Sequence, residues 1–344
     1  MMKVLVTGAN GFIGQPLTIF LTKHGYQIRS VVRVAPDHFQ DKEIRKSKEP
    51  EDLVAVGSID SHTDWANVLQ DIDTVIHLAA RVHKINDDAV NPLTAFREVN
   101  TAGTEHLARE SAKIGVRRFV YLSTVKVNGE ETGLRVEETG PIDKKRQAIF
   151  SENDIPNPQD PYAISKWEAE QALRAISNET GMEVVIVRAP LVYGPGVKAN
   201  FLSLLQVIDC GIPLPLRSVN NSRSLVSLDN LVDFIFTCIK HPAAAGETFL
   251  VSDGNDLSTP ELIRKIALFM VRPCRVLPFS PSLLCFIGKL VGKDAAVNRL
   301  CSSLQVDITK ARNVLGWEPL VSVDDGLKKT VEWYLINKAV GSNQ

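Results

Sequence analysis

Short apolar runs alternate with longer amphipathic stretches along the first half of the chain. The runs are continuous and rich in β-branched residues, which is typical of strands buried on both faces. The stretches between them carry apolar residues at helical spacing. Strands are predicted at 4–7, 26–33, 53–56, 74–80 and 118–124, with a sixth ending near 188, and helices at 12–21, 93–115 and from 160 to about 181. This alternation predicts an α/β protein with a parallel sheet covered by helices.

Three glycines mark the junction between the first strand and the first helix. They are Gly8, Gly11 and Gly14. Because glycine has no Cβ atom, a pyrophosphate can approach the exposed N–H groups at the start of such a helix. The spacing differs from the Gly-x-Gly-x-x-Gly of classical dehydrogenases, but the strand–turn–helix context is the required one. The turn predicts a dinucleotide site, and a tight glycine turn without a ligand is the alternative.

The end of the second strand indicates which dinucleotide binds. Arg33 stands where a residue of such a fold faces the adenosine ribose. A carboxylate there would accept hydrogen bonds from the ribose 2′-hydroxyl, whereas a guanidinium suits a 2′-phosphate. The sequence therefore favours NADP(H), with NAD(H) as the other candidate. A solvated charge at the start of a loop is the alternative interpretation of Arg33.

Further residues are expected along the path of the cofactor. Ile59 follows the third strand, where the adenine ring would lie against the sheet edge. Ala79 and Ala80 end the fourth strand with side chains small enough for close approach. Asn100 lies in a predicted helix, where a polar role explains its side chain better than helix preference does.

Composition and charge narrow the class of protein. The 344 residues predict two lobes, and 39 basic against 40 acidic residues give a net charge of −1. That balance offers no electrostatic reason to expect a nucleic acid or an anionic membrane as partner. His77 and His83 have no second ligand at metal spacing, so no metal is expected.

Cysteine usage and hydropathy bear on location. The five cysteines are widely separated and the chain begins directly with its first strand, so we expect free thiols and a cytoplasmic protein. The apolar stretch 276–292 is too short and too interrupted to span a membrane. We interpret it as a packing or dimer-contact helix, with a membrane-surface role as the alternative.

Two hydroxyl groups and a tyrosine–lysine pair complete a family pattern. Ser123 and Thr124 end the fifth strand at the carboxyl edge of the sheet, where open parallel sheets bind ligands. Tyr162 and Lys166 are four residues apart and so share a helix face. With the glycine turn, Asn100 and the runs 188–196 and 223–229, these motifs resemble the extended short-chain dehydrogenase/reductase family of nucleotide-sugar epimerases, dehydratases and reductases. The resemblance covers nearly the whole chain, down to 315–319.

The resemblance implies a Rossmann-type, doubly wound parallel sheet with a smaller C-terminal substrate lobe. It assigns residues 1–188 and about 224–253 to the NAD(P)-binding domain, and residues 189–223 and 254–344 to the lobe that binds the nucleotide sugar. Dimerisation is common in the family, so a homodimer is expected. Cofactor contacts are expected from Gly8, Gly11, Phe12, Ile13, Gly14, Arg33, Ile59, Ala79, Ala80, Asn100, Tyr162 and Lys166.

The catalytic unit implied by the resemblance is Thr124, Tyr162 and Lys166. A phenol with an ordinary pKa of about 10 is a poor acid or base near neutrality. We expect the Lys166 ammonium, together with an oxidised nicotinamide, to stabilise the phenolate, and Lys166 also to bind the nicotinamide ribose. Thr124 would hold the sugar oxygen while Tyr162 moves the proton. An ordinary amphipathic helix is the alternative for the tyrosine–lysine pair alone.

Substrate contacts are implied in the second half of the chain. Asn200 resembles a family contact to the nucleotide diphosphate, and Arg223 matches the arginine that family members direct at the diphosphate. Arg299 is a second candidate. Surface salt bridges are the alternative for both arginines.

Departures from the family pattern narrow the reaction. Sugar 4,6-dehydratases have an Asp-Glu pair directly after the catalytic hydroxyl, whereas this chain has Val125 and Lys126, so dehydration is disfavoured. The run 276–304 looks most like reductases of UDP-4-keto-6-deoxy-N-acetylhexosamines. The predicted function is reduction of the C4 keto group of such a UDP-sugar by NADPH, with Tyr162 as proton donor. The alternatives are a UDP-hexose or UDP-N-acetylhexosamine 4-epimerase and, from another class, a non-catalytic dinucleotide sensor.

Overall fold

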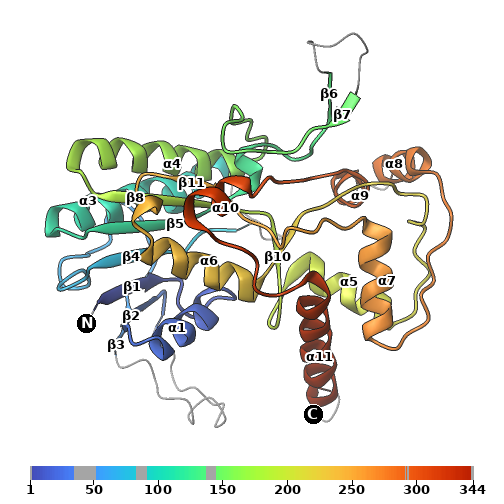
Figure 1. Ribbon diagram of the computed structural model, residues 1–344, viewed down its shortest axis with the longest axis horizontal. Helices are drawn as coiled ribbons and strands as arrows, with labels where there is room; N and C mark the ends of the chain where they lie inside the picture. Colours follow the sequence, from blue (N-terminus) through green and yellow to red (C-terminus); the bar gives the residue numbers. More distant parts are fainter. Residues whose placement is uncertain are drawn as a thin grey trace.

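A parallel sheet of seven described strands forms the centre of the molecule (Figure 1). The computed structural model describes residues 2–34, 52–82, 91–136, 145–290, 292 and 294–341. The strand order is β11-β8-β5-β4-β1-β2-β3, and every neighbouring pair is parallel. The strands are β1 (Lys3–Thr7), β2 (Gln27–Val32), β3 (Asp52–Ala55), β4 (Thr74–His77), β5 (Arg118–Thr124), β8 (Glu183–Ala189) and β11 (Thr248–Leu250).

Helices cover both faces of this sheet, as the continuous apolar strands predict. Side chains alternate along each strand, so Val4 and Val6 enter one buried cluster and Leu5 enters another. The first cluster includes residues of α1 (Gly14–Lys23) and α6 (Leu228–Lys240), and the second includes residues of α3 (Thr104–Ile114) and α4 (Pro161–Thr180). Figure 1 shows these two helix pairs on opposite sides of the sheet. The predicted Rossmann-type fold is confirmed.

The helix predicted at 93–115 is three segments. α2 (Pro92–Phe96) and α3 flank a π-helical stretch, η2 (Arg97–Gly103), which contains Asn100. Gly103 ends the stretch where a Cβ atom would lie 2.9 Å from the carbonyl oxygen of Ile59. Single turns of π-helix occur often at functional sites, and this one aims the Asn100 side chain into the protein.

A smaller lobe with its own core lies at the end of the molecule away from the sheet (Figure 1). It contains the parallel pair β9 (Leu191–Tyr193) and β10 (Leu225–Ser227). Its helices are α5 (Ala199–Asp209), α7 (Thr259–Phe269), α8 (Pro281–Leu290), α9 (Asp294–Cys301) and α11 (Val323–Gly341). The short helix α10 (Thr309–Leu315) returns to the first cluster of the sheet domain.

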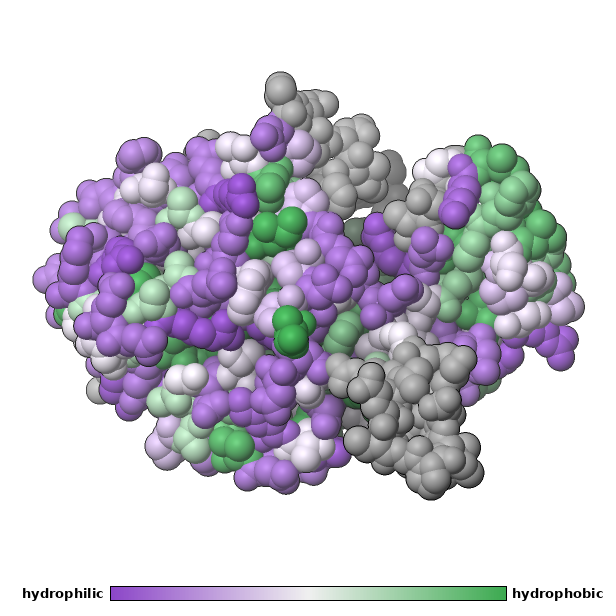
Figure 2. Space-filling view, turned by 90° about the horizontal axis from the view of Figure 1, so that it is seen from above, coloured by the Kyte–Doolittle hydropathy of each residue, from purple (hydrophilic) through white to green (hydrophobic). Residues whose placement is uncertain are grey.

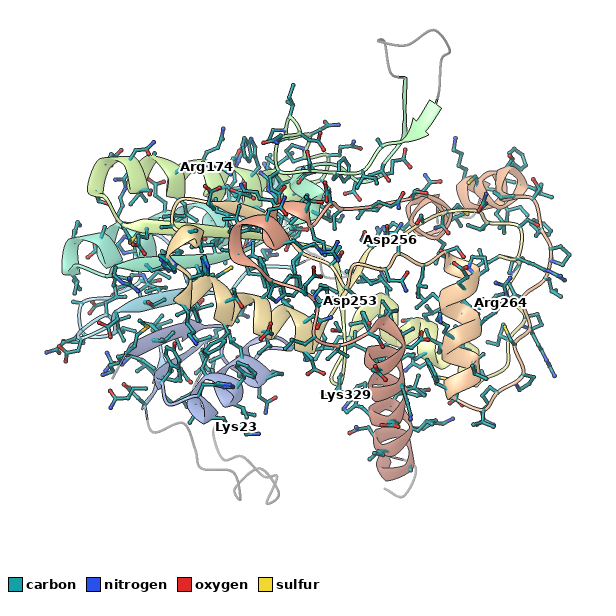
Figure 3. All side chains as sticks on the ribbon, viewed as in Figure 1. Lys23, Arg174, Asp253, Asp256, Arg264 and Lys329 are labelled. Carbon is teal, nitrogen blue, oxygen red and sulfur yellow. The ribbon has the colours of Figure 1, made fainter. Side chains whose placement is uncertain are left out.

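A buried carboxylate joins the lobe to the sheet domain. Asp253 accepts hydrogen bonds from the Tyr193 hydroxyl at 2.7 Å, the Asn230 side chain at 2.7 Å and the Ser227 amide at 2.8 Å. Figure 3 shows Asp253 and Asp256 between the two parts of the molecule. The remaining short elements are η3 (Val125–Val127), η4 (Pro242–Ala244) and the antiparallel pair β6 (Leu134–Val136) and β7 (Lys145–Gln147). Within the described residues, no helix is both long and apolar enough to cross a bilayer.

Candidate active site

The glycine turn packs closely against the end of β4. Gly8 has φ +68°, and a Cβ atom there would lie 3.0 Å from the Ala79 nitrogen. A Cβ atom on Gly14 would lie 2.1 Å from the Gly8 carbonyl oxygen. The Thr7 hydroxyl accepts hydrogen bonds from the Leu78 and Ala79 amides at 3.2 and 3.1 Å. The turn is therefore tight because its backbone approaches itself and the neighbouring strand end, as a phosphate cradle requires.

The other predicted cofactor residues occupy varied environments. Phe12 and Ile13 are partly buried and pack on the core, and Ala79 and Ala80 are half-buried after β4. Arg33 is exposed directly after β2, and Ile59 is buried beside Gly103. The geometry thus leaves the Arg33 guanidinium accessible at the strand end.

Asn100 joins two segments of the site. Its Oδ1 accepts the Arg81 amide at 2.8 Å, and its Nδ2 donates to the Arg81 carbonyl at 3.1 Å and to the Ser165 hydroxyl at 3.0 Å. Asn100 thus has the polar role that the sequence predicts, because it connects the segment after β4 to helix α4.

Helix α4 carries Tyr162 and Lys166 toward the carboxyl end of β5. The Asp160 carboxylate caps the helix by accepting the Ala163 amide at 2.6 Å. The buried Lys166 ammonium donates to the Leu122 carbonyl at 2.6 Å and lies 4.0 Å from the centre of the Tyr121 ring. Thr124, two residues after Leu122, is buried at the strand end, and Tyr162 is half-buried. Because α4 packs against β5 and η3, the structure brings the three predicted catalytic residues to one edge of the sheet.

Burial dominates the titration of the tyrosine–lysine pair. It lowers the pKa of Lys166 to about 7, partly opposed by the negative charge of Glu170. It raises the pKa of Tyr162 to about 12, with a further contribution from the charge of Asp160. The protein's own groups thus keep the phenol protonated at neutral pH, and the expected lowering of its pKa by Lys166 is not among the effects that shift it.

A buried ion-pair network lies one helical turn after Lys166 on α4. The carboxylate of Glu170, which is fully buried on α4, accepts two hydrogen bonds from Arg188 at 3.0 and 2.6 Å and one from the Ser123 hydroxyl at 2.6 Å. Arg188 also donates to the Asn128 side chain at 3.0 Å. Ser123 therefore points to this network rather than to a ligand. Glu170 is not among the site residues predicted from the sequence, although its position four residues after Lys166 is a signal.

Lys126 forms a second ionic cluster at the start of α4. Its ammonium contacts the Asp160 carboxylate at 2.6 Å and the Glu130 carboxylate at 2.8 Å. The residue that replaces a dehydratase carboxylate is thus paired with the capping residue two positions before Tyr162. The Asp160 charge that raises the pKa of the phenol thus belongs to an ion pair.

The structure brings together two of the three substrate residues predicted in the second half of the chain. The Arg223 guanidinium donates to the Arg299 carbonyl at 2.7 Å and to the Ser302 carbonyl at 3.0 Å. Arg299 is exposed on α9, and Asn200 is exposed in the first turn of α5. Phe201 is buried in the lobe and stacks on Tyr193, with ring centres 5.7 Å apart.

His77 plays a structural role in the core of the sheet domain. His77 is buried and is hydrogen-bonded to the Thr7 hydroxyl at 2.7 Å and the Thr104 hydroxyl at 3.0 Å. Burial, with the charge of Lys166, lowers the pKa of His77 to about 3, so the ring is neutral near neutrality. His83 lies outside the described residues. The described part of the chain holds no group of three metal-ligating side chains.

The fold and the site define a dinucleotide-dependent enzyme of the short-chain dehydrogenase type. Residues 4–252 match the model of the NAD dependent epimerase/dehydratase family, and the chain belongs to this family. The predictions of an extended short-chain dehydrogenase/reductase and of an enzyme are thereby confirmed.

Individual relatives share nearly the full length of the chain. A UDP-glucose 4-epimerase of Vibrio cholerae is 43% identical over 97% of this chain and 95% of its own. An N-acetyl-α-D-glucosaminyl-diphospho-ditrans,octacis-undecaprenol 4-epimerase of Escherichia coli O157:H7 is 26% identical over 97% of this chain and 96% of its own. The crystal structure of UDP-glucuronic acid 4-epimerase from Bacillus cereus in complex with NAD superposes with a TM-score of 0.76 at 22% identity, covering 98% of this chain and 99% of that one.

Proposed function

We propose that the protein is an NAD-dependent 4-epimerase of a UDP-linked hexose or N-acetylhexosamine. The observation that carries this proposal is the position of Thr124, Tyr162 and Lys166 at the carboxyl edge of the sheet that carries the glycine turn. The V. cholerae relative, 43% identical over 97% of the chain, is by name a UDP-glucose 4-epimerase and supports this reaction over the others. The reductase that the sequence analysis placed first becomes the second candidate.

Each catalytic side chain has one role in this proposal. Tyr162 takes the proton from the C4 hydroxyl as that carbon is oxidised to a ketone, and it returns the proton when the ketone is reduced on the opposite face. Thr124 holds the same oxygen by a hydrogen bond. Lys166 orients the nicotinamide ribose from its position beside Leu122. Bound NAD supplies the acceptor for the hydride of C4 and the positive charge that lowers the pKa of Tyr162 from about 12.

A specific observation keeps the reductase as the second candidate. Arg33 is exposed after β2, where a guanidinium suits the 2′-phosphate of NADP(H). An epimerase retains its cofactor and has no need of that phosphate, whereas a reductase draws NADPH from solution. Replacement of Arg33 by alanine should weaken NADPH binding and leave NADH binding unchanged if this contact forms.

The substrate also has two candidate carriers. Nucleotide sugars and polyprenol-linked sugars both present a diphosphate, and the E. coli relative acts by its name on an undecaprenol-linked sugar. Arg223 and Arg299 are suited to a diphosphate in either form.

One experiment separates these functions. Purified protein is given UDP-glucose, UDP-N-acetylglucosamine, their 4-keto derivatives and a polyprenyl-diphosphate N-acetylglucosamine, with each nicotinamide cofactor. An epimerase interconverts the C4 epimers with bound NAD and without net change in reduced nicotinamide. A reductase oxidises NADPH only with a keto sugar, and a sensor binds the dinucleotide but converts nothing. The Tyr162→Phe variant is the matched control, because it lacks only the hydroxyl that transfers the proton.

Other features stay predictions. These are the domain division at residues 188, 224 and 253, the homodimer and the cytoplasmic location. Size-exclusion chromatography with light scattering tests the homodimer directly.

A further inference from the structure

Helix α8 presents an apolar stripe to solvent. Its ten residues are all described and are apolar except Ser282 and Lys289, yet only Gly288 is buried. Leu283, Phe286, Ile287 and Leu290 follow the i, i+3, i+4, i+7 spacing of one helix face, and they are 46%, 59%, 41% and 70% exposed. Such a stripe normally packs on a core. Here it faces outward, while Leu284 packs on the lobe.

The apolar surface extends beyond the helix. Leu277, before α8, and Leu300, in α9, are also exposed. Figure 2 shows hydrophobic residues gathered at the end of the molecule that carries α8 and α9. A contiguous patch of this kind marks an interaction surface rather than ordinary surface scatter. We define Leu277, Leu283, Phe286, Ile287, Leu290 and Leu300 as the α8 patch.

The sequence segment that carries the α8 patch is basic. Residues 273–304 contain four basic residues, Arg275, Lys289, Lys293 and Arg299, against one acidic residue, Asp294. The whole chain has a formal charge of −1, so this segment departs sharply from the average. The net charge of the whole chain therefore concealed a basic and apolar segment.

We propose that the α8 patch docks on an anionic lipid bilayer and holds the enzyme at the membrane surface. Apolar side chains of an interfacial helix enter the boundary of the acyl chains, and basic residues beside them reach the headgroups. A second copy of the chain fits this surface poorly, because a symmetric contact would bring two positive segments together. With ten residues, α8 is too short to span a bilayer, so the attachment is peripheral.

Docking would place the substrate lobe next to the bilayer. Helix α8 packs on α9, which carries Arg299, and the Arg299 carbonyl holds the Arg223 guanidinium at 2.7 Å. A diphospho-sugar anchored in the bilayer would approach these two arginines from the docked side. This last step rests on the proposed function with its polyprenol-linked carrier, whereas the docking itself does not.

Vesicle flotation of the full chain tests the docking. The protein should float with vesicles of phosphatidylglycerol and phosphatidylethanolamine and should stay in the soluble fraction with phosphatidylcholine alone. The double variant Phe286→Ala, Ile287→Ala should partition about tenfold less, and Lys289→Gln about fivefold less. Ile155→Ala and Leu320→Ala are matched controls, because these side chains are 88% and 72% exposed outside the patch, and they should float like wild type.

Other results would overturn the docking. The proposal fails if the wild type does not float with the anionic vesicles, or if the Phe286→Ala, Ile287→Ala variant floats equally well. It also fails if the wild type is an oligomer in sedimentation velocity and binds no lipid, while the Phe286→Ala, Ile287→Ala variant is a monomer. A second copy of the chain then covers the patch. Epimerase activity on soluble UDP-sugars is measured in parallel. If the wild type has no such activity, the proposed function is refuted, but the flotation result is unaffected.

Discussion

The buried ion pair between Glu170 and Arg188 gives a sharp test of how the site is held together. Glu170 is fully buried, Arg188 is 2% exposed, and their closest atoms are 2.6 Å apart. Glu170→Gln preserves the shape of the side chain but removes its charge, so the Arg188 guanidinium stays in a low-dielectric interior without its main counter-charge. Breaking such a pair costs about 3–5 kcal/mol of the free energy of unfolding. That loss is large compared with the total free energy of unfolding of a typical protein, which is about 5–15 kcal/mol.

The same helix offers a matched control. Glu179, also on α4, pairs with Arg109 at 3.0 Å, but the two side chains are 55% and 43% exposed. Glu179→Gln is the same chemical change in solvent, where an ion pair contributes about 0–1 kcal/mol. The predicted difference between the two variants is therefore about 2–5 kcal/mol.

Urea unfolding followed by tryptophan fluorescence measures this difference. Trp167 is a local probe, because the guanidinium carbons of Arg188 and Arg174 lie 5.7 and 5.3 Å from its ring. We also expect kcat to fall more than KM rises in Glu170→Gln, since Ser123 adjoins Thr124 and donates to Glu170. Equal losses of stability in both variants would refute the reasoning, because the Glu170 pair would then behave as if it were solvated.

Three further predictions concern the turn, the acid and the buried histidine. Gly14→Ala should weaken NAD binding by about 1–3 kcal/mol, because the new Cβ atom would lie 2.1 Å from the Gly8 carbonyl oxygen. Fluorescence titration measures this loss. The control is Gly133→Ala, whose Cβ atom would have nothing within 4 Å and which should bind NAD like wild type. Tyr162→Phe should lower kcat by about 10²–10⁴-fold in the epimerase assay with cofactor affinity unchanged, and near-normal turnover would remove Tyr162 from the mechanism. The pKa of His77 is about 3 when folded, below its ordinary 6.5, so the unfolded chain binds the extra proton and stability falls as pH drops from 6.5 toward 3. Between pH 6.5 and 5, urea unfolding should show wild type losing up to about 2 kcal/mol more than His77→Gln, and parallel losses would contradict this.

Local patterns were sufficient to predict the sheet, the glycine turn and the tyrosine–lysine pair. Continuous β-branched runs predict strands buried on both faces, and their alternation with amphipathic stretches predicts a parallel sheet. The glycines lie where a strand meets a helix, and Tyr162 and Lys166 share a face because helical spacing alone requires it. These features depend on residues close together in the chain, so the sequence by itself determined them.

Features that depend on distant residues needed the tertiary structure. Glu170 and Arg188 are 18 residues apart, and their pairing follows from the packing of α4 on β8. Ser123 and Thr124 are adjacent hydroxyls with opposite directions on a pleated strand, and only the fold shows that Ser123 faces Glu170.

Helix α8 shows the same division most clearly. Its spacing indicates an apolar face, but a helical pattern does not say whether that face meets the core of the same chain or the solvent. That choice depends on which surfaces the rest of the fold leaves available, and here the lobe core is completed by α5, α7 and α11. Periodicity along the chain thus determined which residues belong together on an element, whereas packing between elements decided what each face meets.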